Sequence, residues 1–187
     1  GKEVTSMIIS RLPATVKLAV SAMIFAVTLG IFLGVIAAAY KNKFADKFTL
    51  FFSMIGFSMP SFWLGPLLII VFSLWLGWFP ISGESGFSGM VLPSITLGLG
   101  MAAFTGRLTR NTLLETLSQD YIRTAQAKGC SPTRVLLRHA LPNALLPVVT
   151  VVFLQVGALL TGAIITEAVF SWPGVGSLIV DSLQRRD

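Results

Sequence analysis

Long uncharged stretches of apolar residues, separated by short polar segments, dominate this chain of 187 residues. The clearest apolar runs cover residues 18–40, 48–78 and 145–165, and a shorter run covers 92–107. A helix of about 20 apolar residues crosses the hydrocarbon core of a bilayer, so the pattern predicts about four transmembrane helices. The predicted fold is therefore all-α and polytopic, with residues 1–187 forming a single transmembrane domain.

Small residues recur at every fourth position of the run 18–40 and therefore share one face of the predicted helix. Such a face lets a second helix approach closely, and Gly30 with Gly34 forms a GxxxG pair. The repeat continues for roughly four turns, which favours a packing seam over a chance arrangement in an Ala- and Gly-rich helix. The small residues are Ala22, Ala26, Gly30, Gly34 and Ala38.

The run 48–78 is too long for one crossing and too short for two. Pro60 predicts a kink, because proline removes a backbone donor and disfavours helical geometry at the preceding residue. We expect Ser58 and Ser61 to bond to the backbone that Pro60 frees, rather than to bind substrate. Aromatic residues expected at the membrane interface follow at the end of the run: Trp75, Trp78 and Phe79.

Composition supports a membrane protein and excludes several other classes. Apolar residues make up 54% and charged residues 12% of the chain, whereas a soluble domain would carry about a quarter charged residues. Cys130 is the single cysteine and His139 the single histidine, so neither an intrachain disulfide nor a metal or catalytic cluster is expected. The net charge of +6 comes from basic residues between apolar runs, which favours membrane topology over nucleic-acid binding as its cause.

The distribution of basic residues predicts the orientation of the loops. Residues 41–47 and 107–138 carry an excess of Lys and Arg, which is typical of cytoplasmic loops, so Lys43 and Arg134 should face the cytoplasm. The loop 80–89 has one acid, Glu84, and no base, so it should face outside. Three basic residues do not follow this rule, since they would lie on the outer side: Lys2, Arg11 and Lys17.

The polar segment 118–142 has the signals of two short helices joined by a turn. Asp120 is a good N-cap for a first helix, and Gly129 is expected to end it in a left-handed conformation. Ser131 with Pro132 is the favoured pairing for a second helix start. Pro142 should stop or kink that second helix.

Each of these two helices has an apolar face. Helices this short are unstable alone, so their apolar faces need something to pack against. A lipid surface and a groove on a cytoplasmic partner both fit, and the length and capping of the unit favour the partner. The apolar faces contain Tyr121, Ile122 and Ala125 in the first helix, and Val135, Leu136 and Ala140 in the second.

This segment resembles the EAA motif of binding-protein-dependent ABC permeases. That motif reads E-A-A, three residues, G, nine residues, I, any residue, L-P. The matching residues here are Arg123-Thr124-Ala125, Gly129 and His139-Ala140-Leu141-Pro142. Arg123, Thr124 and His139 depart from the general motif, and these departures look like the peptide/nickel branch of the family.

Other stretches of the chain also look like that branch. They lie at 11–15, 58–63, 76–83 and 167–176, so the resemblance covers nearly the whole sequence. It implies the core of a six-span ABC importer permease of type I, without its first and last spans. It also implies a multi-pass protein of the inner (plasma) membrane.

The resemblance implies partners that this chain would serve. They are a second permease subunit, cytoplasmic ABC ATPases and an extracytoplasmic substrate-binding protein. The chain has no G-x-x-x-x-G-K-[ST] phosphate loop, so ATP and Mg²⁺ are expected on the ATPases, and this chain is expected to carry no cofactor and no enzymatic activity. Peptides and nickel chelates both remain open as substrates, because specificity is expected largely in the binding protein.

The resemblance also assigns roles to individual residues. The part around 125–134 would fill a groove on the ATPase, with Gly129 at the turn. The expected ATPase-docking residues are Tyr121, Arg123, Thr124, Ala125, Lys128, Gly129, Arg134, His139, Leu141 and Pro142.

Four residues are candidates for the substrate pathway or a gate: Ser58, Pro60, Gln155 and Glu167. Gln155 fits a hydrogen bond between helices better than a place on the path. Glu167 could reach the membrane interface or form part of an outer gate. A stand-alone channel or secondary transporter is the alternative function. It would predict facing charged or broken helices and repeats, and the sequence shows one kinked run, no acidic pair and no repeat.

Overall fold

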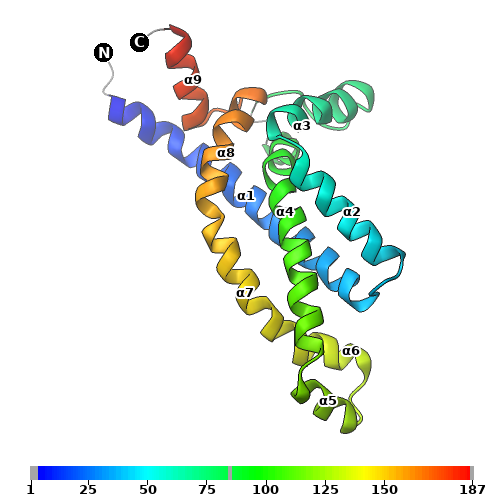
Figure 1. Cartoon of the computed structure of the whole chain (residues 1–187). Helices are drawn as coiled ribbons and strands as arrows, with labels where there is room; N and C mark the ends of the chain where they lie inside the picture. The colour runs from blue at the N-terminus through cyan, green and yellow to red at the C-terminus, as the bar shows by residue number, and fades with distance from the viewer. Residues whose placement is uncertain (1–3, 84–85, 186–187) are drawn as a thin grey trace. The chain divides into compact units, whose positions relative to one another are not determined.

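Helices form every regular element of the computed structural model, which describes residues 4–83 and 86–185 (Figure 1). The all-α class is confirmed for this part of the chain. The first elements are α1 (Val4–Ala39), α2 (Phe44–Ser58), α3 (Ser61–Leu68), the π-helical η1 (Ile69–Trp75) and α4 (Gly86–Leu117). The later elements are α5 (Asp120–Ala127), α6 (Pro132–Arg134), the π-helical η2 (Val135–Ala140), α7 (Leu141–Leu154), α8 (Val156–Val169) and α9 (Val175–Arg185).

Three of the described helices are long and apolar enough to cross a membrane. They are α1, α4 and the continuous stretch Pro132–Leu154, and a fourth crossing results if α2 and α3–η1 form one broken span. The expected number of about four is thus confirmed. The position of the last span was wrong, because the helix begins before 145 and is interrupted at Gln155.

The predicted interruption at Pro60 is confirmed. α2 ends at Ser58, and Pro60 has an extended backbone with φ −66° and ψ 140°. The Pro60 carbonyl accepts bonds of 3.1 Å from the amides of Trp63 and Leu64, which begins α3. The expected side-chain bonds of Ser58 and Ser61 were wrong, because within residues 4–83 and 86–185 neither hydroxyl makes a hydrogen bond.

Pro142 does not stop its helix, so of the two outcomes expected from sequence, a stop or a kink, the stop is ruled out. The chain continues through η2 directly into α7, with Pro142 in the first turn of α7. A proline ring clashes with the carbonyl four residues before it. The wider π-helical turns of η2 lie where that clash would fall, so the helix absorbs the proline without ending.

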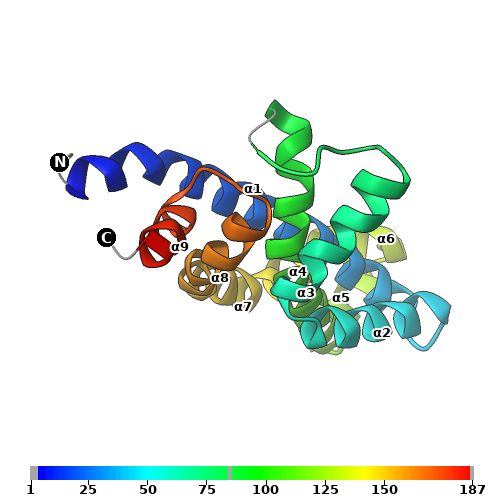
Figure 2. The ribbon, with the colours of Figure 1, turned by 90° about the horizontal axis from the view of Figure 1, so that it is seen from above.

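The described chain divides into two compact units, and each is described by itself. Unit 1 comprises Gly1–Phe25, Met59–Leu99 and Val156–Asp187. In unit 1, α8 packs against α3 and α9, and α8 and α9 lie side by side in Figure 2. Gly65 on α3 permits this contact, because a Cβ there would lie only 2.9 Å from Cγ1 of Val169.

Unit 2 comprises Ala26–Ser58 and Gly100–Gln155, and it contains most of the small-residue seam. A Cβ on Gly30 would lie 2.8 Å from the carbonyl oxygen of Ala102, and one on Gly34 would lie 2.6 Å from that of Gly106. No side chain fits at either glycine. The predicted packing seam is therefore confirmed in this unit, where α1 meets α4.

Candidate functional site

The segment 118–142 folds as two short helices joined by a tight turn, as the sequence predicts. The N-cap of α5 lies one residue earlier than expected. Gln119 is the N-cap, with an extended backbone and no side-chain bond, and Asp120 is the first helical residue. The expectation for Asp120 was therefore wrong by one position. Its carboxylate still lies where a negative charge stabilises the positive end of a helix dipole.

Gly129 ends the first helix in the left-handed conformation, with φ +82°, as predicted. Its amide donates to the carbonyl of Gln126 at 2.9 Å, and the amide of Cys130 donates to the carbonyl of Ala125 at 3.2 Å. These two bonds form a Schellman motif, which satisfies carbonyls that the helix end would leave open. A Cβ on Gly129 would meet no atom within 4 Å, so only backbone conformation requires glycine here.

The second helix also starts as predicted. Ser131 is the N-cap with φ −62° and ψ 149°, and Pro132 occupies the first turn. The Ser131 side chain makes no capping bond, but its carbonyl accepts a 2.9 Å bond from the amide of Val135. The turn therefore has a defined backbone path from Gly129 to Val135.

The apolar faces of both helices are buried against other parts of unit 2. Ile122 and Ala140 are completely buried, and they share one cluster with Leu113 of α4 and Ala38 of α1. Sequence reasoning sought a lipid surface or a partner as the cover for these faces. The cover is the chain itself, which the sequence could not reveal because the contacts join distant residues.

Burial divides the expected docking residues into three groups. Ala125 is buried in the cluster, and His139 and Leu141 are half-buried. The exposed residues are Tyr121, Arg123, Thr124, Lys128, Gly129, Arg134 and Pro142. Arg138 is exposed as well, so the outer surface of the segment is basic, with Asp120 paired to Arg123 at 3.7 Å.

Tyr121 ties the segment to the following helix. The side-chain amide of Asn143 donates to the Tyr121 hydroxyl at 3.0 Å and to the carbonyl of His139 at 3.1 Å. This bond bridges α5 and α7 around the turn. Sequence reasoning had placed Tyr121 on the apolar face, and the structure shows instead an exposed residue with a structural bond.

An ion pair that the sequence analysis missed anchors the neighbouring α1–α2 turn. The Arg110 guanidinium on α4 donates from Nη2 to Oδ2 of Asp46 on α2 at 2.8 Å, and Nε donates to Oδ1. The backbone amide of Asn42, which has φ 65°, donates to the same Asp46 oxygen at 2.8 Å. A planar guanidinium suits such two-point binding of a carboxylate. The only available signal was a lone acid in a basic loop.

Glu167 is engaged by other residues of the chain. It is fully buried in unit 1, where its carboxylate accepts bonds from the Thr15 hydroxyl at 2.6 Å and from the amides of Gly176 and Ser177 at 2.7 and 3.2 Å. Those amides belong to the first turn of α9, where a negative charge is favoured. The carboxylate thereby closes the Trp172-Pro173-Gly174 turn.

The remaining pathway candidates lie at helix interruptions. Ser58 and Pro60 flank the break between α2 and α3, and Gln155 is the residue between α7 and α8. The Gln155 side-chain nitrogen is buried and has no hydrogen-bond partner among the described residues. The expected bond between helices is therefore absent for this nitrogen within that part of the chain.

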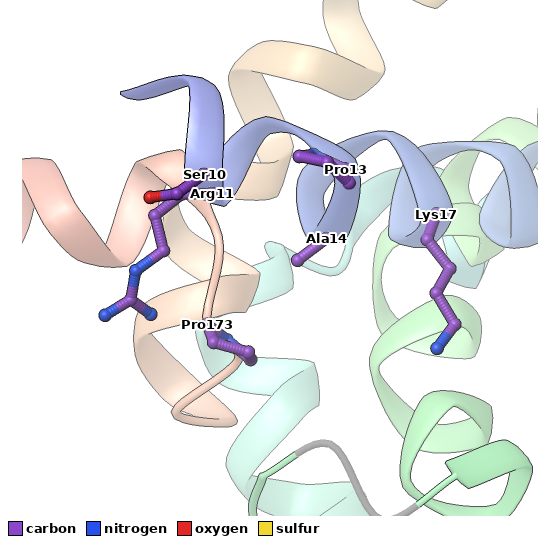
Figure 3. Close-up of a pocket in the computed structure, with 6 residues that line it drawn as sticks. All are labelled: Ser10, Arg11, Pro13, Ala14, Lys17 and Pro173. Atoms are coloured by element: carbon purple, nitrogen blue, oxygen red, sulfur yellow. The ribbon is translucent and has the colours of Figure 1, made fainter. Parts of the chain in front are cut away.

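Two of the basic residues expected on the outer side line a pocket of about 480 Å³ in unit 1. Figure 3 shows Arg11 and Lys17 extending from α1 on either side of Pro173. The Lys17 ammonium lies 5.8 Å from the ring centre of Trp172, and the Trp172 indole donates to the carbonyl of Ala14 at 2.9 Å. Packing on an aromatic ring thus accounts for one of these charges. Lys2 and Glu84 lie outside the described residues.

The sequence of this chain matches a known protein family. The family described as "Binding-protein-dependent transport system inner membrane component" matches residues 30–187, and the chain belongs to it. Two relatives, a glutathione permease and a di/tripeptide permease, confirm the resemblance to the peptide/nickel branch.

One relative is the glutathione transport system permease protein GsiC of Escherichia coli strain K12. It is 46% identical over 186 residues, which cover 100% of this chain and 61% of that protein. The di/tripeptide transport system permease protein DppB of Pseudomonas aeruginosa strain UCBPP-PA14 is 44% identical over 203 residues, covering 94% and 60%. The chain thus spans about three fifths of the length of these relatives.

A solved structure shows the same fold. The MetNI methionine ABC transporter, in inward-facing conformations, superposes with a TM-score of 0.76 at 20% identity. The match covers 97% of this chain and 82% of the transporter chain. The fold is therefore that of an ABC importer permease.

Proposed function

We propose that this chain is the membrane core of a permease subunit that imports small peptides across the inner membrane, driven by cytoplasmic ATPases. The family description supports a binding-protein-dependent transport system. GsiC is named for glutathione, a small peptide, and DppB for di- and tripeptides, whereas neither name mentions nickel. Peptides are accordingly the substrate class that we favour over nickel chelates.

The observation that carries this proposal is the construction of the segment 118–142. Most of its apolar side chains are buried within unit 2. Apart from Tyr121 and Leu137, its exposed surface is polar and basic. An amphipathic helix that rests on lipid must turn its apolar face to the bilayer. Here that face is already covered, which favours a protein partner on the polar side.

The same construction allows the segment to transmit movement. Leu113 of α4, Ile122 of α5 and Val135 of η2 belong to one cluster, which also contains Ala38 of α1 and Ala144 of α7. A closely packed cluster moves as a body rather than deforming continuously. An ATPase that shifts the exposed surface would therefore shift the ends of three long helices.

The proposed assembly contains further components. A second permease subunit would complete the path, and a binding protein would deliver peptide on the outer side. ATP and Mg²⁺ would be held by the ATPases, because hydrolysis requires a phosphate-binding loop that this sequence does not contain. The permease itself would then contribute transport and no chemical step.

Charge reversal of the exposed surface tests this function. In the full-length transporter, replacing both Arg123 and Arg134 with Glu should remove the ATPase subunits from the purified complex and abolish peptide uptake. Lys43→Glu is the matched control, since Lys43 is an exposed base of the α1–α2 turn. Normal ATPase copurification and uptake in the double variant would contradict the proposal.

A further inference from the structure

Two arginines of α4 lie one helical turn apart in unit 2 and have different surroundings. Arg110 binds the buried carboxylate of Asp46 at two points. Arg107 is exposed and makes no hydrogen bond or ion pair with any residue in 4–83 or 86–185. A cation in a membrane-spanning helix is costly, and such residues usually face a water-filled cavity or a partner. Arg110 has an acidic partner in Asp46, whereas Arg107 has none among the described residues. Arg107 is therefore available to bind an anionic group.

The geometry of α4 indicates where the Arg107 side chain lies. Long side chains on a helix lean toward its N-terminus, over the residues three and four positions earlier. For Arg107 those residues are Phe104 and Ala103, and both line one pocket with it. This direction leads away from Leu117 and, on the expected topology, away from the cytoplasm. The Arg107 side chain thus lines the pocket between α2 and α4.

The pocket has a volume of about 280 Å³ and combines one cation with an apolar wall. No Asp or Glu of the described chain is among its lining residues. Ser53 lines it, but its hydroxyl already donates to the Thr49 carbonyl at 2.8 Å. The complete lining is Leu50, Ser53, Met54, Phe57 and Ser58 of α2, with Ala103, Phe104 and Arg107 of α4.

We propose that this pocket is a substrate site in which Arg107 binds a carboxylate of the transported peptide. A guanidinium offers two parallel donors to a carboxylate, and the aromatic wall suits the apolar body of a short peptide. The inference rests on the proposed peptide import and adds the recognised group and the recognising residue. Ser58, which the sequence analysis named as a pathway candidate, also lines this pocket.

A labelling experiment tests the pocket without requiring ATP-driven transport. Full-length permease with Cys130→Ser and Ser58→Cys, assembled with its partners in proteoliposomes, is reacted with anionic and with cationic methanethiosulfonate reagents. The ratio of the anionic to the cationic labelling rate should be about tenfold higher with Arg107 than in Arg107→Gln, because the guanidinium attracts the anionic reagent. Lys47→Gln removes an exposed charge of α2 outside the pocket and should leave the preference intact.

Protection of the same thiol identifies the ligand group. Alanyl-phenylalanine should slow the labelling of Ser58→Cys, and its C-terminal amide should not. Arg107→Gln should abolish the protection and Arg107→Lys should retain part of it, because lysine keeps the charge without the two-point geometry. Absent labelling, a preference independent of Arg107, or equal protection by peptide and amide would each overturn the proposal.

An uptake assay separates this inference from the proposed function. If Arg107→Gln raises the KM for peptide about tenfold or more while ATPase copurification stays normal, both stand. If the thiol preference and the protection depend on Arg107 but the complex lacks ATP-driven uptake, the pocket stands and the importer function fails. An unchanged KM in Arg107→Gln would contradict the pocket while leaving the importer in place.

Discussion

The turn at Gly129 and the turn at Gly174 both join two helices, but one is open and the other is closed. A side chain on Gly129 would meet no atom within 4 Å, and backbone bonds alone define that turn. A side chain on Gly174 would overlap the carboxylate of Glu167, which fills the inside of its turn. Glycine is required for conformation in the first turn and for space in the second.

The Gly129 turn is therefore available for contact with a partner, whereas the Gly174 turn is held closed by bonds within unit 1. The polar groups around Glu167 are used within unit 1, by Thr15 and by the first turn of α9. The polar groups around Gly129 are exposed and basic, while the apolar side of their helices is buried. On our proposal the open turn binds the ATPase partner. The closed turn holds α1 to the α8–α9 connection within unit 1.

The largest expected effect comes from adding one methyl group to the closed turn. Gly174→Ala should lower the free energy of unfolding by about 3 kcal/mol or more, because the methyl group and a buried carboxylate would occupy the same space. Gly129→Ala, the matched change in the open turn, should cost about 1 kcal/mol through its backbone conformation. Thermal unfolding of the purified full-length complex measures both, and equal losses would remove the distinction between the turns.

The next effect tests whether the Glu167 charge closes the turn. Glu167→Gln keeps the size of the side chain and removes a buried charge that accepts three hydrogen bonds, so it should cost about 2 to 3 kcal/mol. Asp181→Asn, at an exposed position of α9, is the control and should cost less than about 0.5 kcal/mol. Similar unfolding temperatures for the two variants would show that Glu167 does not hold the turn closed.

A third effect tests the buried face beneath the open turn. Ile122→Ala should cost about 2 kcal/mol, because it leaves a cavity in the cluster of unit 2. Leu137→Ala removes a side chain that is 50% exposed in the same segment and should change stability much less. If the two variants unfolded alike in detergent, the apolar faces would be covered by lipid rather than by the chain.

Local patterns explain what could be predicted from the sequence. The left-handed Gly129, the Ser131–Pro132 helix start and the break at Pro60 each depend on a few neighbouring residues. The small-residue seam was also recognisable, because one helix period relates all of its members. Asp120 was misplaced by a single position. The helix stop that was one of two outcomes expected at Pro142 is absent, because a π-helical turn can accommodate a proline.

The missed features join residues that are far apart in the chain. Thr15 and Glu167 are separated by 152 positions, and Asp46 and Arg110 by 64. No periodicity or spacing relates such residues, so only the folded chain shows that each acid has its own partner. The pocket beside Arg107 was missed for the same reason, since α2 and α4 contribute separate halves of it.

A substitution in the open turn tests the central claim most directly. That claim is our proposal that the segment around Gly129 couples the ATPases to the permease. Gly129→Val should strain the left-handed turn by roughly 1 to 2 kcal/mol, although its Cβ would meet no atom within 4 Å, and should tilt η2 relative to α5. Gly129→Asn is the matched control, because asparagine tolerates the left-handed conformation.

Peptide uptake and ATPase copurification are measured together in both variants of the full-length transporter. We expect Gly129→Val to reach the membrane at normal levels and to lose most of its uptake, while Gly129→Asn retains it. Normal copurification together with normal uptake in Gly129→Val would contradict the account.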